Sequence, residues 1–408
     1  MSSLLRSLRL AARSLRRSRS FSLVAIITFA LGIGATTAIF GVVDAVLLDP
    51  LPYPESERLA AISSRWQDEA QGQISPAEYF DYAAELESAT AFGVWGIGSL
   101  TLTGSGEAEQ IPAGYLSHGA LPAFGVRPLH GRSFTEAEDA PGAAPVALLS
   151  YGLWQRRFGG RADAVGSSIV ADGTAVTIIG VMPRSFRLPE DFEAGESAGL
   201  YLPLQLERPA PDDRGSHFLE GIARLAPGAT IHTLSADAAR IAAEFQRAFP
   251  DEYPREMGFT AFAMPLRESI LGPVRPLVLL VFGAAALVLL IACVNVANLV
   301  VVRSDRRERE LAVRAAMGAE RRHLLHQFLA ETLLLALAGG ALGLAIAAAA
   351  TRLLPRILPP EVPIPGELAI DWRVTAFAFT VVIATAIVTA IAPLFRRRGD
   401  LPGALREE

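Results

Sequence analysis

The sequence contains no lysine, so all 37 of the residues counted as lysine or arginine are arginines. A Walker A loop needs a lysine that reaches the β- and γ-phosphates of a bound nucleotide. The 408 residues therefore contain no standard P-loop ATPase site.

Cysteine is almost as scarce, because Cys293 is the only one. It lies in an apolar stretch, and a disulfide within the chain is impossible. Any region outside the cytoplasm has to rely on its own hydrophobic core for stability.

Motifs for catalysis are also scarce: the sequence has no H-E-x-x-H and no C-x-x-C, and no dinucleotide loop between a strand and a helix. A cluster of serine, histidine and aspartate in space stays open as an alternative. The histidines that it could use are scattered, at His118, His130, His217 and His232.

One set of residues has the spacing of metal ligands on a helix, namely Glu320, His323 and His326. A cytoplasmic helix surface of mixed charge explains these residues better. We therefore expect no catalytic site, no metal site and no enzyme activity in this chain.

Charge and hydropathy divide the chain into two kinds of region. Hydrophobic residues make up 51% of it and the mean hydropathy is +0.34, which is too apolar for an ordinary soluble protein. Residues 44–275 hold 17 arginines against 31 acidic residues, whereas the rest holds 20 against 11. This acidic middle makes nucleic acid an improbable partner and predicts a membrane protein with an acidic domain on one side.

Four apolar stretches are long enough to cross a membrane, for which about 20 helical residues suffice. We place them at 21–48, 276–302, 330–354 and 374–395. Seven arginines lie between the second and third stretches, and short arginine-rich loops stay in the cytoplasm. These arginines are Arg303, Arg306, Arg307, Arg309, Arg314, Arg321 and Arg322.

The rest of the topology follows from that placement. Residues 49–275 form an extracytoplasmic domain, 303–329 a cytoplasmic segment, 355–373 an extracytoplasmic loop and 396–408 a cytoplasmic tail. Residues 1–20 read as a basic amphipathic helix that binds the lipid surface; a solvated positive flank is an equal alternative.

Small residues in the spans allow close approach of helices. They are Gly32, Gly34 and Ala38 in the first span and Gly339 and Gly343 in the third. Packing within one subunit is a better explanation for them than a seam between two subunits.

The extracytoplasmic region predicts an α+β fold. Strands are expected at 58–64, 91–102, 146–149, 175–181, 218–225 and 259–266, and helices at 76–87, 151–157 and 231–249. The first and last strand–helix–strand sets match in order and length, so residues 55–110 and 215–270 are expected to form one split β-α-β part. Residues 111–214 would be a lobe inserted between its halves.

The cytoplasmic segment has the pattern of a short capped helix. Glu310 and Arg314 are a favourable i,i+4 pair, Leu311 and Met317 add an apolar surface, and Gly318 suits a left-handed cap. Such a helix can transmit a displacement from a cytosolic partner to the membrane-spanning helices. A solvated loop that only sets topology is the alternative.

Several runs of the sequence resemble the MacB/FtsX-type permeases of ABC transporters, and in particular their duplicated "orphan" group (ADOP type). The resemblance extends over essentially the whole chain. The runs are SFSLVAIITFALGIGATTAIFGVVDAVLLDPL from Ser20, LWQRRFGG from Leu153, IIGVMPRSF from Ile178, FLEGIARLAPG from Phe218 and NVANLVVVRSDRRERELAVRAAMG from Asn295.

The resemblance implies a MacB-like periplasmic core domain and an inner-membrane, multi-pass permease that acts in efflux or export. ATP and Mg²⁺ would bind a separate ATPase subunit, whose motion is relayed to the periplasm by mechanotransmission. A second permease unit would complete a homodimer or heterodimer, and a periplasmic adaptor or client is a further expected partner. The contact with the ATPase would be formed by Arg306, Glu308, Glu310, Leu311, Arg314, Met317 and Gly318.

Two departures from the duplicated group leave alternatives open. Its members usually carry two units in one chain, whereas this sequence carries one. It could be a single-unit member, a half that pairs with another chain, or an incomplete product. An ATPase is often not evident for the group. The chain could then regulate a periplasmic partner such as a cell-wall hydrolase, or serve as a scaffold without an ATPase.

Overall fold

The computed structural model divides into two units, a helical bundle formed by residues up to Asp49 and from Arg275 onward, and a domain from Pro50 to Val274. The residues it describes are 18–67, 69–103, 108–194, 197–209, 214–305, 321–353 and 370–396, with isolated positions at 11, 13, 15 and 16.

Several predicted segments lie outside the described residues. They comprise most of the amphipathic helix at 1–20, residues 306–320 of the cytoplasmic segment, residues 355–369 of the outer loop and the tail from 397. The predictions for these segments stand as predictions.

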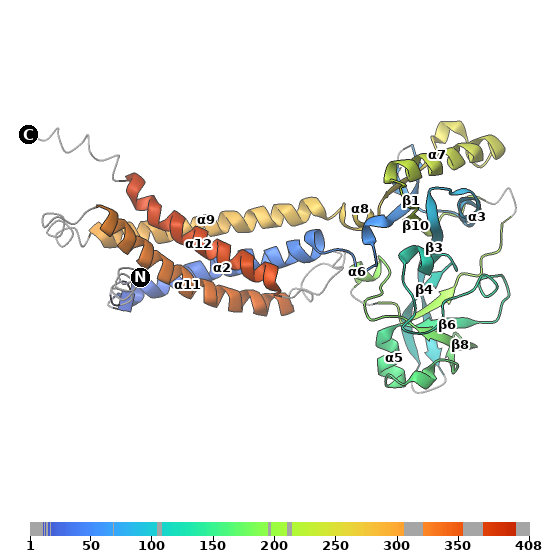
Figure 1. Ribbon diagram of the computed structural model, residues 1–408, viewed down its shortest axis with the longest axis horizontal. Helices are drawn as coiled ribbons and strands as arrows, with labels where there is room; N and C mark the ends of the chain where they lie inside the picture. Colours follow the sequence, from blue (N-terminus) through green and yellow to red (C-terminus); the bar gives the residue numbers. More distant parts are fainter. Residues whose placement is uncertain are drawn as a thin grey trace, which may run out of the picture. The chain divides into compact units, whose positions relative to one another are not determined.

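Four helices form the bundle, and each is long and apolar enough to cross a membrane. Figure 1 shows them as the four long helices of this unit. Helix α2 packs against α9 and α11, and α12 packs against α9 and α11. The bounds are Arg19–Val43 for α2, Arg275–Asp305 for α9, Arg321–Leu353 for α11 and Trp372–Arg396 for α12.

Helix α2 continues into a π-helical turn, η1 (Asp44–Leu48), before the chain leaves the bundle at Asp49. Three prolines follow at Pro50, Pro52 and Pro54. Proline cannot donate a helical hydrogen bond and disfavours helix in the residue before it, so the helix ends here.

The domain is built on one mixed sheet of 11 strands, in the order β11-β1-β10-β3-β4-β9-β6-β8-β5, with β2 paired to β1, and β7 paired to β3 and β8. The strands are β1 (Leu59–Trp66), β2 (Glu69–Gly72), β3 (Ala89–Thr103), β4 (Glu109–Leu116), β5 (His130–Gly131), β6 (Val146–Leu149), β7 (Ser168–Ala171), β8 (Thr174–Val181), β9 (Leu200–Pro203), β10 (Glu220–Leu225) and β11 (Thr260–Pro265).

Short helices connect and cover these strands. They are η2 (Ser56–Arg58), α3 (Pro76–Glu85), α4 (Ala120–Phe124), α5 (Tyr151–Phe158), η3 (Ala162–Ala164), α6 (Asp191–Ala194), α7 (Ile231–Ala248), η4 (Arg255–Met257) and α8 (Leu266–Leu271).

Two β-α-β units, β1-α3-β3 and β10-α7-β11, interleave to form one half of the sheet, with β1 paired to both β10 and β11. Strand β3 pairs with β10, so the four strands are antiparallel to their neighbours. Helices α3 and α7 bury their apolar faces on these strands, through Tyr79 and Tyr82 of α3 and Leu234, Ile241 and Phe245 of α7. Figure 1 shows both helices beside β1, β10 and β3. The split β-α-β arrangement is therefore present.

The lobe is not a separate domain, because the sheet runs through both parts without a break. The 15 residues of β3 supply Val94 to the first core and Leu100 and Leu102 to a second core around α5, β6 and β8. Strand β4 begins at Glu109, two residues before the expected boundary, and pairs with β3 from Trp95 to Leu102. The lobe has its own core but shares the framework of the first half.

Candidate functional site

The residues expected to bind an ATPase lie between Arg306 and Gly318, outside the described part of the chain. Glu320 is also outside it, and His323 and His326 lie on α11 without described side chains. The functional geometry that the structure shows is therefore in the bundle and in the domain.

The predicted small residues of the spans lie at helix contacts. A Cβ atom added to Gly34 of α2 would be 2.9 Å from the carbonyl oxygen of Gly343 on α11. One added to Gly339 would be 2.6 Å from Cβ of Phe29 on α2. Such distances leave no room for a side chain, so the backbones of α2 and α11 touch along this line.

A second contact joins α2 to α9. A Cβ atom at Gly32 would lie 3.1 Å from Cδ1 of Leu289, and Ala38 is buried with 5% of its surface exposed. The hydroxyl of Thr36 donates to the carbonyl oxygen of Gly32 at 2.8 Å and reaches that of Ala285 on α9 at 3.3 Å. Helices α2 and α9, which precede and follow the domain in the chain, are thus in direct contact.

Three phenylalanines join the same helices to α12. Phe40 of α2 stacks on Phe377 of α12 with 3.9 Å between ring centroids, and Phe282 of α9 lies 6.2 Å and 6.0 Å from them. Offset aromatic contacts of this kind stabilise by roughly 1 kcal/mol each beyond their buried area.

An ionic contact lies beyond these rings, at the start of α12. The guanidinium of Arg373 is 2.9 Å from Oδ1 of Asp49 and 3.6 Å from Oδ1 of Asp44. Asp44 is buried within the π-helical turn, and its Oδ1 makes no hydrogen bond in the described part of the structure. Because a buried carboxylate is costly without a cation nearby, Arg373 holds the end of α2 to α12. We call Asp44, Asp49 and Arg373 the outer clasp.

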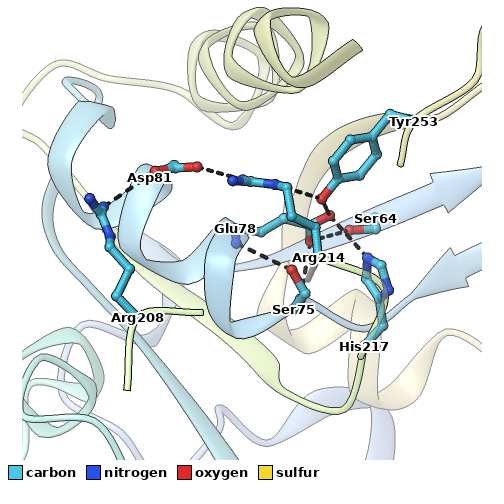
Figure 2. A network of polar contacts seen from close by, with 8 residues as sticks. All are labelled: Ser64, Ser75, Glu78, Asp81, Arg208, Arg214, His217 and Tyr253. Carbon is cyan, nitrogen blue, oxygen red and sulfur yellow. Dashed lines mark hydrogen bonds and ion pairs between the residues drawn. The ribbon is translucent and has the colours of Figure 1, made fainter. Parts of the chain in front are cut away.

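The domain contains a polar network around Glu78, whose side chain is fully buried (Figure 2). Ser75 and Glu78 form a capping box at the start of α3. The carboxylate also accepts hydrogen bonds from the hydroxyl of Ser64 on β1, at 3.2 Å, and from that of Tyr253, at 2.9 Å. Three segments distant in sequence meet at this one side chain.

His217 completes the shell of the buried carboxylate. Its Nε2 lies 3.0 Å from Oε1 of Glu78, and its Nδ1 lies 3.0 Å from the carbonyl oxygen of Gly215. Both neighbours are acceptors, so both contacts are hydrogen bonds only when both ring nitrogens carry protons. The protonated ring would place a positive charge against Glu78.

Arg214 extends the network toward the surface. Its Nη2 donates to Asp81 at 2.5 Å and its Nε to the hydroxyl of Tyr253 at 3.3 Å, and its guanidinium lies 4.3 Å from the ring centroid of Phe249. Burial raises the pKa of Tyr253 well above its usual value, which keeps the hydroxyl protonated as a donor to Glu78. The segment that returns from the lobe is thereby fixed to α3 and α7 (Figure 2).

The other histidines of the domain form no catalytic cluster among the described residues. His118 pairs with Asp139 at 3.2 Å, a contact that raises the pKa of the imidazole, and His130 packs on Trp154. No group of three metal-ligand side chains occurs among the described residues.

The chain belongs to the family of MacB/FtsX-like ABC transporter permeases. The family model "MacB-like periplasmic core domain" matches residues 22–241, and "FtsX-like permease C-terminal" matches residues 282–402. It is thus a multi-pass membrane protein with four spans and a large periplasmic domain between the first two.

Relatives with established names are export proteins. A pyoverdine export ATP-binding/permease protein of Pseudomonas syringae pv. tomato is 27% identical over 64% of this chain and 38% of its own length. A macrolide export ATP-binding/permease protein of Rhodospirillum rubrum is 28% identical over 56% of this chain and 34% of its own. The chain therefore spans about a third of the length of these curated relatives.

Among solved structures, the chain is similar to the periplasmic region of MacB from Actinobacillus actinomycetemcomitans. The match covers 56% of this chain and 97% of the MacB chain. The TM-score is 0.39 at 11% identity.

Proposed function

We propose that the chain is the inner-membrane permease subunit of an ABC-type exporter. It relays the motion of an ATPase to its periplasmic domain without binding nucleotide itself. The export activity named for the relatives supports the transport class. The absence of lysine from residues 1–408 supports an ATPase site on another subunit.

The observation that carries the proposal is the way in which the domain is connected to the bundle. The domain begins after α2 and ends before α9, so both connections are ends of membrane helices. These two helices contact each other through Gly32 and Thr36, and the outer clasp joins α2 to α12. A displacement of the bundle helices therefore reaches the domain through both connections at once.

The orientation follows from the number of spans. Four spans place both ends of the chain on one side and the domain between the first two on the other. A periplasmic domain then requires cytoplasmic termini and a cytoplasmic segment 303–329, in agreement with its arginines. We infer that this segment contacts the ATPase through Arg306, Glu308, Glu310, Leu311, Arg314, Met317 and Gly318.

Binding of the ATPase tests the proposal. Detergent-solubilised chain should retain its cognate ATPase in a pulldown, as a complex with two permease units. Glu310→Arg and Gly318→Pro should each reduce the retained ATPase by at least tenfold, because they reverse a contact charge and break the helix end. Glu256→Arg, a charge reversal at an exposed position of the periplasmic domain, is the matched control and should bind normally.

Equal retention by wild type and both variants would contradict the docking role. Co-purification of a cell-wall hydrolase with the domain, without transport in proteoliposomes, would favour the second candidate, a transmembrane regulator of a periplasmic partner. The export names of the relatives make transport the better supported of the two.

A further inference from the structure

A hollow of about 550 Å³ lies in the lobe of the domain. Its walls are the start of β4, the first half of α5, the segment after β8 and the residues before β9. This volume is in the range of small-molecule binding sites.

The charge of the hollow is opposite to that of its surroundings. Among the described residues, its charged lining consists of Arg156, Arg184 and Arg187 against one acid, Glu109. Residues 44–275 as a whole have 17 arginines against 31 acidic residues. Three arginines that converge on one cavity in an acidic domain indicate a site for an anion.

Glu109 neutralises the positive charge of these arginines only weakly. Its carboxylate is 3.7 Å from Arg156 and 3.6 Å from Arg157, both longer than a hydrogen bond. Arg187 has no hydrogen bond or ion pair at its guanidinium within the described residues; only its carbonyl oxygen is used, by the hydroxyl of Tyr53. Arg187 can therefore donate to a ligand, and Arg156 would give up only its 3.7 Å ion pair with Glu109.

Helix α5 adds backbone donors to the same wall. The Ser150 hydroxyl accepts from the amide of Leu153, but the amides of Tyr151 and Gly152 precede the first intrahelical hydrogen bond. Both residues line the hollow. Gly152 has no side chain to cover its amide, and the position of its missing Cβ is 3.7 Å from Nη1 of Arg156. The guanidinium of Arg156 thus lies beside the backbone of Gly152 at this wall of the hollow.

Two of the three arginines, Arg156 and Arg184, come from runs that resemble the permease family, LWQRRFGG and IIGVMPRSF, and Arg187 directly follows the second run. Their apolar residues are explained by the fold, because Leu153, Trp154, Val181 and Phe186 are buried. Arg156 and Arg184 are exposed and add nothing to the core. Both line the same hollow as Arg187.

We propose that this hollow binds a small ligand with a carboxylate or phosphate group, held by Arg156 and Arg187, with the amides of Tyr151 and Gly152 as further donors. Arginine binds such groups with two parallel hydrogen bonds, and helix N-termini favour anions. The site is separate from the cytoplasmic segment and does not depend on an ATPase.

Calorimetric titration of the full-length protein in neutral detergent tests the proposal, with citrate, inorganic phosphate and neutral glycerol as soluble probes. Mixed micelles with phosphatidylglycerol or phosphatidylcholine distinguish a lipid headgroup from a soluble anion. We expect saturable binding of an anionic probe and none of glycerol. Arg156→Gln and Arg187→Gln should each weaken it roughly tenfold, the usual effect of losing a charge-assisted hydrogen bond.

Arg247→Gln is the matched control, because Arg247 is an exposed arginine on α7, outside the hollow. It should bind as the wild type does, and Arg187→Lys, which keeps the charge but loses the second parallel hydrogen bond, should lose less affinity than Arg187→Gln. Unfolding followed by tryptophan fluorescence confirms that each variant is folded. Absence of binding to every anionic probe, or equal affinity in the wild type, Arg156→Gln and Arg187→Gln, would overturn the proposal.

Discussion

Gly34 and Gly343 set the distance between α2 and α11 at the level of single residues. A side chain at Gly34 would collide with the backbone of α11. Cys293, the only cysteine of the chain, is buried in α9 and so reports on unfolding of the bundle through its reaction with a thiol dye.

Gly34→Leu should destabilise the bundle by roughly 1–3 kcal/mol, the usual cost of overpacking. The measurement is the temperature at which Cys293 becomes reactive. Gly283→Leu is the control, because nothing lies within 4 Å of the position of its Cβ. Equal midpoints for the two variants would contradict the close contact.

Glu78 shows what can and cannot be predicted from sequence at this scale. The Ser75-x-x-Glu78 pattern followed by an apolar helix face is readable as a capping box. The contacts with Tyr253 and His217 join residues 175 and 139 positions away, and no local pattern predicts them. Glu78 was therefore absent from the predicted site residues.

Tyr253→Phe should lower the stability of the domain by about 1–3 kcal/mol, because it leaves Glu78 and Arg214 each without one hydrogen bond. Three of the four tryptophans, Trp66, Trp95 and Trp154, lie in the domain, so tryptophan fluorescence follows its unfolding. Tyr115→Phe is the control, since no hydrogen bond is seen for its hydroxyl in the described structure. A loss of stability equal to that of Tyr115→Phe would count against the network.

Glu190 makes the stability of the domain depend on pH. Burial raises its pKa to about 7, although the indole of Trp95 donates to both carboxylate oxygens. Between about pH 4.5 and 7 the folded state then binds more protons than the unfolded state, so stability falls as pH rises, by at most about 3 kcal/mol. Glu190→Gln should reduce this slope in fluorescence-monitored urea unfolding, and the exposed Glu256→Gln should not. An unchanged slope in Glu190→Gln would refute the assignment.

Among the elements, segments with a clear apolar pattern were predictable and segments without one were not. Helix α7 begins at Ile231 and ends one residue before the expected Phe249, and β6 has the predicted bounds Val146–Leu149. Strands β4 and β9 were not expected. Proline is uncommon within strands but Pro112 lies inside β4, and β9 has only four residues, so neither sequence has a strong strand signal.

The outer clasp is likewise a product of tertiary structure, because Arg373 and Asp49 are separated by 324 residues. Variants of its residues test how much each ion pair contributes to the contact between α2 and α12. Asp49→Ala should change stability by less than about 1 kcal/mol, since both side chains of that pair are partly exposed. Arg373→Ala should cost more, roughly 1–3 kcal/mol, because it leaves buried Asp44 without a cation.

A double-mutant cycle measured by Cys293 reactivity distinguishes the two contacts. Asp44→Asn should restore much of the stability lost in Arg373→Ala, because the unpaired charge is removed. Additive losses in the double variant would show that Arg373 does not stabilise Asp44.

For the whole molecule, the apolar spans and the arginine distribution predicted four helices with a domain between the first two. The continuity of the sheet across the lobe was not predictable, because it depends on the pairing of β3 with β10 in one half and with β4 and β7 in the other. At this scale we propose that ATP hydrolysis on a separate ATPase subunit moves the periplasmic domain.

Electron–electron distances between spin labels test that claim most directly. One label is placed at an exposed position of each domain, Glu256→Cys, in a reconstituted complex of two permease units with the ATPase, in a Cys293→Ala background. We expect the distance distribution to shift on addition of ATP and Mg²⁺ and to stay unchanged with Glu310→Arg. A distribution in the wild type that ATP does not alter, although the ATPase is bound and active, would contradict the claim.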